Sequence, residues 1–86
     1  MIRLRHIQYF VTASEQGSFR KAANLLNIQE SAVSRRIRDL EDRLGASLFH
    51  RHSGGVSLTV AGQRFLRRVR IALQQIEDGI NDVAAI

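Results

Sequence analysis

Residues 18–45, SFRKAANLLNIQESAVSRRIRDLEDRLG, decide the fold. The apolar residues of the first part recur at three- and four-residue spacing, which predicts a short helix over residues 19–26. Ser18 is placed to cap the start of that helix with its hydroxyl. Asn27, directly after it, tolerates the left-handed backbone conformation that a tight turn needs.

A further helix is predicted after this turn and ends at Gly45. Its apolar stripe is formed by Val33, Ile37, Leu40 and Leu44. The outward positions of its first half carry serine and arginine, and the acidic pair Glu41 and Asp42 comes late. The helix macrodipole favours the reverse order, so this arrangement indicates a negatively charged ligand. Two short helices joined in this way predict a helix-turn-helix unit over about 19–44.

The flanking segments predict a mainly α fold. Three- and four-residue spacing of apolar residues predicts a first helix over 4–17. Residues 47–51 and 56–58 are predicted to be two short strands, with a turn at Ser53-Gly54-Gly55. Thr59 is expected to cap a last helix from Val60 to near the C-terminus, of roughly 27 residues and about 40 Å. We therefore expect a head over 1–59 and a linker helix over 60–86.

The last helix carries an apolar stripe that is wide and long for so small a head to cover. In one alternative it folds back and buries the stripe within one chain; in the other it pairs with a second copy. We favour a homodimer, because a body of about 60 residues cannot cover the whole rod. The residues expected at that interface are Phe65, Leu66, Val69, Ala72, Leu73, Ile76, Ile80 and Val83.

Composition narrows the class of protein. The 86 residues allow one small domain, and the absence of cysteine excludes disulfides, thiolate zinc sites and a cysteine nucleophile. No apolar run is long enough for a membrane span, so we expect a cytoplasmic protein. The net charge of +5 divides into +8 through Gln75 and −3 from Ile76 onward. Such an excess serves either solubility or a polyanionic partner.

Catalysis and metal binding are not expected. The sequence contains no nucleophile elbow and no phosphate-binding loop, and Gly54-Gly55 is interpreted as a turn. His50 and His52 alternate on one strand face, but two imidazoles without a third ligand make a poor metal site. We expect a protein that is not an enzyme and has no cofactor of its own.

Residues 4–62 closely resemble the DNA-binding domain of the LysR-type transcriptional regulators. The matching stretches are FVTASEQGSFRKAANLLNI, SAVSRRIRDLEDRLGASLFHR and VSLTVAGQRFL. They cover about 70% of the chain and contain the family's Ala-Val-Ser-Arg, Leu-Glu-x-x-Leu-Gly, Leu-Phe-x-Arg and Leu-Thr-x-x-Gly patterns. The resemblance implies a winged helix-turn-helix whose linker helices pair antiparallel in a dimer.

The resemblance also implies the binding residues and partners. It implies double-stranded DNA with an imperfect inverted repeat as ligand, and a missing C-terminal domain that would bind a small-molecule inducer and could assemble a tetramer. The third helix would enter the major groove and Arg51 of the wing would lie at the minor groove. The expected DNA contacts are Ser18, Arg20, Lys21, Glu30, Ser31, Ser34, Arg35, Arg38 and Arg51.

Some roles stay open at this stage. Arg38 could pair with Asp42 instead of contacting DNA, and the Ser34 hydroxyl could bond back to its own helix. Glu30 and Arg36 depart from the family's pattern, and Glu30 could read a base or satisfy the helix dipole. The alternative function is a protein-interaction or dimerisation module that has lost specific DNA binding.

Overall fold

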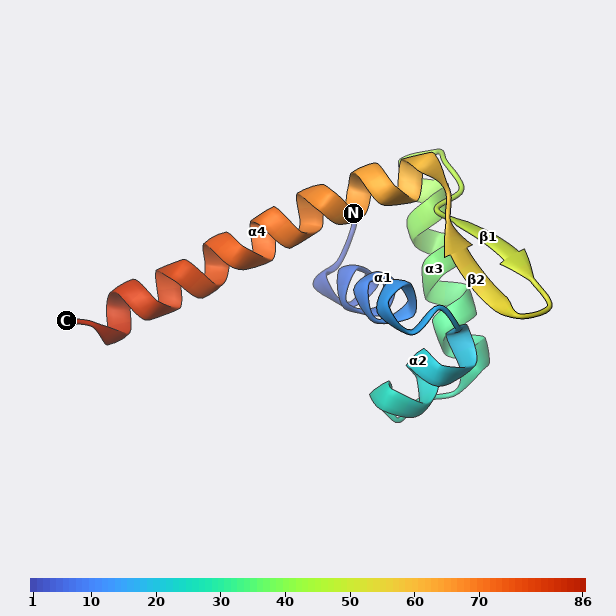
Figure 1. The fold of residues 1–86 in the computed structure, drawn as a ribbon, viewed down its shortest axis with the longest axis horizontal. Helices are drawn as coiled ribbons and strands as arrows, with labels where there is room; N and C mark the ends of the chain where they lie inside the picture. The colour runs from blue at the N-terminus through green and yellow to red at the C-terminus, as the bar shows by residue number, and fades with distance from the viewer.

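The computed structural model describes all 86 residues as four helices and one hairpin (Figure 1). Helices α1 (Leu4–Gln16), α2 (Phe19–Leu26) and α3 (Glu30–Leu44) form the head. Strands β1 (Phe49–His52) and β2 (Gly55–Leu58) form an antiparallel hairpin beside it. Helix α4 (Val60–Ala84) extends far beyond the head, and the molecule is 49 Å along its longest axis. The predicted winged helix-turn-helix is confirmed.

The helix ends follow the capping residues in the sequence. The Ser18 hydroxyl accepts a hydrogen bond from the backbone N–H of Lys21 at 3.1 Å, which fixes the start of α2. Gly17, Asn27 and Gly45 adopt the left-handed conformation directly after α1, α2 and α3. The three predicted stops therefore lie where expected.

The core is built around Phe10 of α1, which is fully buried. Its ring centroid lies 5.6 Å from that of Phe49 on β1 and 5.2 Å from that of Phe65 on α4. The buried stripe of α3, formed by Val33, Ile37 and Leu40, packs into the same cluster. One hydrophobic core thus joins the three helices to the hairpin and to the start of α4.

Both strands of the hairpin differ slightly from their predicted bounds. β1 begins at Phe49 instead of Ser47 and ends at His52 instead of Arg51, and β2 begins at Gly55 instead of Val56. The Leu48 N–H donates to the Glu41 carboxylate at 2.7 Å, and its carbonyl accepts from the Thr59 N–H at 3.0 Å. The register pairs Phe49 with Leu58 and continues to the turn.

The hairpin is fixed to the end of α1 through a close approach of two glycines. The Val56 N–H donates to the Gly17 carbonyl at 3.0 Å. A Cβ on Gly55, whose φ is +133°, would lie 2.2 Å from that same carbonyl oxygen. Only glycine satisfies both the backbone conformation and the space at this position.

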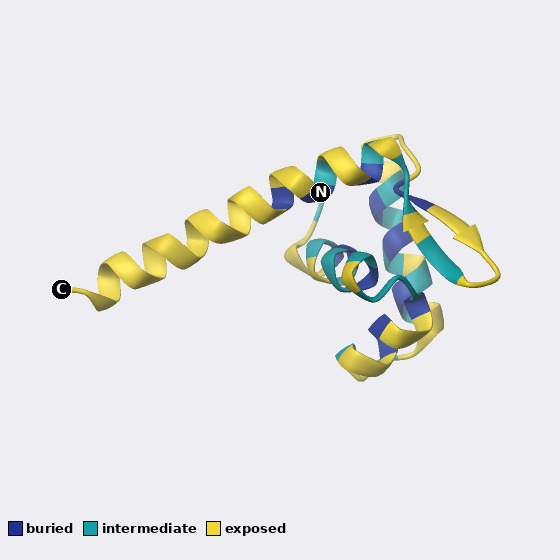
Figure 2. Cartoon of the chain, viewed as in Figure 1, coloured by how far each residue is buried: buried dark blue, intermediate teal, exposed yellow.

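Helix α4 begins inside the head and then leaves it (Figure 2). Thr59 caps it by accepting from the Gly62 N–H at 2.9 Å. Leu66 and Val69 are only 7% and 6% exposed, whereas every residue from Arg70 onward is exposed. Two members of the expected dimer interface, Leu66 and Val69, are therefore covered by their own chain. The fold-back alternative is wrong for the second half of the helix, because nothing in the chain covers it.

None of the helices combines the length and the apolar character that crossing a membrane requires.

Candidate nucleic-acid interface

Four of the expected DNA contacts share the exposed face of α3. Ser31, Ser34, Arg35 and Arg38 follow one another at three- and four-residue spacing, on the side of the helix away from its buried stripe. Ser34 is half-buried and the other three are exposed. This face presents hydroxyl and guanidinium donors to solvent.

A hollow of about 390 Å³ lies next to this face and brings more of the expected residues together. Ser18 and Arg20 reach it from the start of α2, Glu30 from the start of α3, and Arg51 from β1. His52 and the turn residues Ser53 and Gly54 form its outer wall. Lys21, also expected at DNA, is exposed on the first turn of α2 and does not line the hollow.

Arg51 turns toward α3 instead of away from the hairpin. One of its guanidinium nitrogens donates to the Ser34 hydroxyl at 3.2 Å. The other terminal nitrogen lies 3.8 Å from a Glu41 carboxylate oxygen, and the guanidinium carbon lies 4.8 Å from the centroid of the Phe19 ring. In the free chain these three contacts hold the Arg51 side chain against α3 and α2, and its expected place at a minor groove stays a prediction.

Glu41 holds both the hairpin and Arg51, and sequence reasoning missed it. Besides its ion pair with Arg51, one carboxylate oxygen accepts from the Leu48 N–H at 2.7 Å and from the Ser47 hydroxyl at 3.4 Å. Its side chain is 14% exposed. The available signal was its position directly after the buried Leu40, which puts it at the edge of the buried stripe.

The Ser34 hydroxyl does not bond back to its own helix. The hydroxyls of Thr12 and Ser14 on α1 donate to carbonyls four residues earlier, at 2.9 and 2.7 Å. Ser34 instead accepts from Arg51, and its own proton meets no acceptor in the chain. This removes the back-bonding alternative for Ser34.

The alternative pairing of Arg38 with Asp42 is wrong, because the ion pair on α3 is that of Asp39 with Arg43. The Asp39 carboxylate lies 3.3 Å from Arg43 Nε and 2.6 Å from Nε2 of the buried His6. His6 Nδ1 in turn accepts from the Arg3 N–H at 2.9 Å, whereas Nε2, although close to Asp39, forms no well-aligned hydrogen bond with it. Arg38 stays exposed and unpaired.

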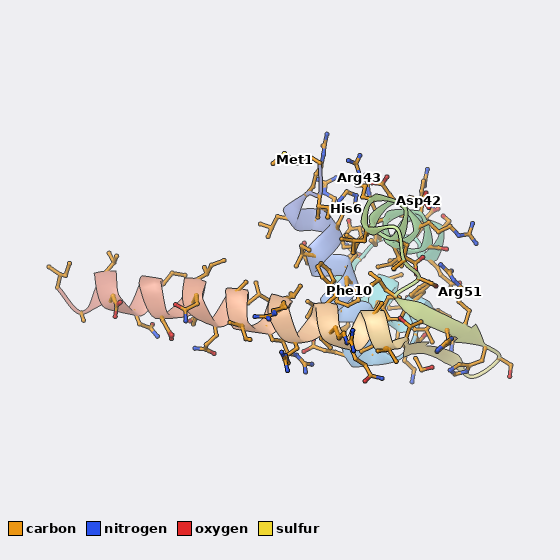
Figure 3. All side chains as sticks on the ribbon, turned by 90° about the horizontal axis from the view of Figure 1, so that it is seen from above. Met1, His6, Phe10, Asp42, Arg43 and Arg51 are labelled. Atoms are coloured by element: carbon orange, nitrogen blue, oxygen red, sulfur yellow. The ribbon has the colours of Figure 1, made fainter.

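The environment of Asp39 holds its pKa below the ordinary value of 3.8. Burial opposes ionisation, but the hydrogen bond and positive charge of Arg43, together with His6, outweigh it. Figure 3 shows His6 and Arg43 near each other beside α1, with Arg51 apart from them by the hairpin. Helix α3 is thus anchored to α1 on one side and to the hairpin on the other.

The remaining residues considered in the sequence analysis are Glu30 and the two histidines of the hairpin. Glu30 is the exposed first residue of α3, where a carboxylate satisfies the helix dipole, and it also lines the hollow. His50 and His52 are exposed, and no group of three or more potential ligands in the chain could hold a metal ion. An additional basic cluster, which sequence reasoning missed, lies on the first turns of α4 at Arg64, Arg67 and Arg68.

Comparison with known proteins supplies the family. The family model of bacterial regulatory helix-turn-helix proteins of the lysR family matches residues 4–63. The chain belongs to the lysR family. The match confirms the resemblance found in the sequence. Because the family consists of transcriptional regulators, it also confirms the expectation that the chain is not an enzyme.

Relatives of known sequence support the same assignment. The HTH-type transcriptional regulator AlsR of Bacillus subtilis is 43% identical over 79 residues, which are 92% of this chain and 26% of AlsR. The regulator PcaQ of Agrobacterium fabrum is 39% identical over 87 residues, covering 98% of this chain and 28% of PcaQ. The lysR-family chain therefore spans about a quarter of the length of these relatives.

Solved structures share the fold over almost the whole chain. A CbnR DBD–DNA complex aligns with a TM-score of 0.86 and 30% identity, covering 96% of this chain and 95% of that one. A BenM DBD bound to catB site 1 DNA aligns with a TM-score of 0.84 and 37% identity, covering 92% and 89%. Both of these solved structures contain DNA.

Proposed function

We propose that this lysR-family domain binds double-stranded DNA sequence-specifically and is the DNA-binding part of a transcriptional regulator. The observation that carries the proposal is the gathering of unpaired donors on one side of the head. Arg20, Arg35 and Arg38 are exposed there and form no ion pair with the chain's own acids. Uncompensated guanidinium groups around a projecting helix suit a polyanion with a groove.

The recognition mode follows from the shape of this side. The exposed face of α3 enters the major groove, where Ser31 and Ser34 approach base edges and Arg35 reaches a base or a phosphate. Ser18, Arg20 and Lys21 at the start of α2 contact the sugar-phosphate backbone. The hairpin with Arg51 lies toward the adjacent minor groove. Relatives of the same fold have been solved in complexes with DNA, which supports DNA as the ligand.

A binding experiment tests the proposal. DNA selected from a random pool should bind at least about a thousandfold more tightly than bulk DNA, with a steep salt dependence. Arg35→Ala should weaken binding and lower the salt slope by about one if it holds a phosphate. Arg5→Ala is the matched control, because Arg5 is exposed on the first turn of α1. A chain with neither preference nor salt slope would be an interaction module instead.

A homodimer is the second part of the proposal. An apolar groove of about 320 Å³ lies between α1 and the first half of α4, formed mainly by Leu4, Ile7, Phe65, Val69, Ala72, Leu73 and Ile76. Beyond the groove the stripe continues with Ile76, Ile80 and Val83, which are 57%, 56% and 72% exposed. The exposed end of one helix and the groove of another offer complementary apolar surfaces.

Charges along α4 favour an antiparallel pair. Arg68 borders the groove and Asp82 lies fourteen residues later on the same flank of the helix. When Ile76 packs against the partner's Ala72, the two-fold axis passes between Gln74 and Gln75. Arg68 then lies beside the partner's Asp82 twice, so the antiparallel pair gains two contacts between opposite charges.

Sedimentation tests this dimer. Ile76→Asp with Val83→Asp should give monomers, and neither change touches the core of the head. Val69 is unsuitable because it is buried in its own chain. Arg68→Asp or Asp82→Arg should weaken the dimer about tenfold, and the two together should restore it. Arg67→Asp is the control of equal charge, since Arg67 lies away from the stripe. Monomers of the unchanged chain at all concentrations would refute the dimer.

The full-length regulator extends this proposal. An inducer-binding C-terminal domain, as the resemblance implies, would follow the linker helix, and a dimer would bring two recognition helices to an inverted repeat about 34–36 Å apart. A tetramer of the full-length protein and a cytoplasmic location fit the same function.

A further inference from the structure

We infer that Arg51 orients the Ser34 hydroxyl so that Ser34 selects a hydrogen-bond acceptor on a base edge. The inference rests on the proposed DNA binding and names a specificity-determining pair within that interface. Arg51 acts here through Ser34 as a positioning residue, and Glu41 and Phe19 hold Arg51 in place.

The polarity of the Ser34 hydroxyl follows from its partner. A serine hydroxyl has one donor and two acceptor lone pairs, and its proton normally rotates to suit its surroundings. A guanidinium has donors only, so the 3.2 Å hydrogen bond from Arg51 uses a lone pair of Ser34. The proton must therefore point away from Arg51. No carbonyl of α3 accepts it, in contrast to the hydroxyls of Thr12 and Ser14.

Three contacts keep Arg51 in this position. Its guanidinium lies over the Phe19 ring at 4.8 Å, beside the Glu41 carboxylate at 3.8 Å, and on Ser34. Glu41 is itself fixed by the Leu48 N–H at the entry to the hairpin. One lone pair of the Ser34 hydroxyl is thus engaged before any ligand arrives, which reduces the ordering cost of binding.

The base chemistry that fits is an acceptor in the major groove. Purine N7, guanine O6 and thymine O4 accept a proton there, whereas the amino groups of cytosine and adenine only donate. With one lone pair taken by Arg51 and its proton free, Ser34 donates to the first group. A base amino group would have to approach the remaining lone pair beside the positively charged guanidinium, which disfavours the second group. Without the guanidinium the same serine would donate to the first group or accept from the second equally well, so the contact with Arg51 gives Ser34 a preference for an acceptor.

Base analogues test this assignment. On the site selected from a random pool, single acceptors are removed by 7-deazapurines, by 2-aminopurine for guanine, or by 5-methyl-2-pyrimidinone for thymine. We expect one position at which the analogue weakens binding of the unchanged domain by about 3- to 10-fold and leaves Ser34→Ala unaffected. Arg51→Lys and Glu41→Gln should both reduce that discrimination. Glu41→Gln keeps an amide oxygen for the Leu48 N–H, so the hairpin entry retains its hydrogen bond.

The double variant separates positioning from direct contact. If Arg51 acts through Ser34, Arg51→Lys should change base preference at that position in the unchanged domain but not in the Ser34→Ala background. Equal effects in both backgrounds, or no acceptor to which Ser34 is sensitive, would overturn the inference while leaving DNA binding intact. Failure of the unchanged domain to select any site would instead refute the proposed function. Circular dichroism and thermal midpoints identify a variant that has lost its fold, and the second variant then decides.

Discussion

The head and the second half of α4 carry the same kind of apolar spacing, but its apolar residues are buried in the head and exposed on α4. In the head, stripes from three helices and the hairpin meet around Phe10 and are buried. From Arg70 onward α4 continues the same spacing with its apolar residues exposed. Figure 2 shows the change within one continuous helix.

The difference shows that periodicity specifies an apolar face without specifying what covers it. The sequence predicts Leu66 and Val69 at the interface with a partner helix, yet their own head covers them. Ile76, Ile80 and Val83 follow in the same stripe and stay open. The division lies where α4 passes the first turn of α1, at Leu4 and Ile7. That point depends on the packing angle between the two helices and has no sequence signal.

Two glycines of α4 provide the strongest test of this division. A Cβ on Gly62 would lie 2.2 Å from the Leu48 carbonyl oxygen and 2.9 Å from a Leu58 methyl carbon. Gly62→Ala should therefore lower the free energy of unfolding by about 1–3 kcal/mol, since backbone must move. Chemical denaturation of the purified domain measures this loss.

Gly79→Ala is the matched substitution in the exposed half. A Cβ there meets nothing within 4 Å in the single chain. Alanine should raise helix content and stability by up to about 1 kcal/mol at concentrations where the chain is monomeric. Equal losses at both positions would mean that α4 is packed along its whole length, and a neutral Gly62→Ala would mean that it is not seated on the head.

Much of the site was predictable because local chemistry determines it. Ser18, Asn27 and Thr59 place the helix ends through capping and turn geometry, and the spacing of α3 identifies its exposed face. The direction of Arg51 was not predictable, because it depends on Glu41 and Phe19, which come from two other elements. A contact that spans 10 to 32 residues leaves no periodic trace in the sequence.

The ion pairs of α3 show that even contacts within one helix are only partly predictable from the sequence. Arg38 with Asp42 and Asp39 with Arg43 have the same four-residue spacing, so spacing alone does not choose between them. The second pair has the acid on the N-terminal side, which is the favourable orientation, and His6 of α1 adds a second partner for Asp39. Orientation was available from the sequence, whereas the approach of His6 was not.

The smallest expected effect compares two carboxylates, one in each region. Because the pKa of Asp39 is lowered in the folded state, its ionised form stabilises the head above the unfolded-state pKa of about 3.9. That contribution is lost as the pH falls through the lower, folded-state value. Asp39→Asn should therefore reduce stability at neutral pH and flatten the loss of stability in acid, as measured by denaturation at a series of pH values.

Asp78→Asn on α4 is the control for this comparison. Asp78 accepts from Gln74 at 2.9 Å on the exposed part of the helix, and an asparagine oxygen can accept the same bond. The loss of stability of Asp78→Asn at acidic pH should therefore match that of the unchanged chain. If Asp39→Asn behaves like Asp78→Asn, the His6–Asp39–Arg43 cluster does not hold α3 to α1. The recognition helix would then depend on the core and on the hairpin side, with Glu41 and Arg51, for its position.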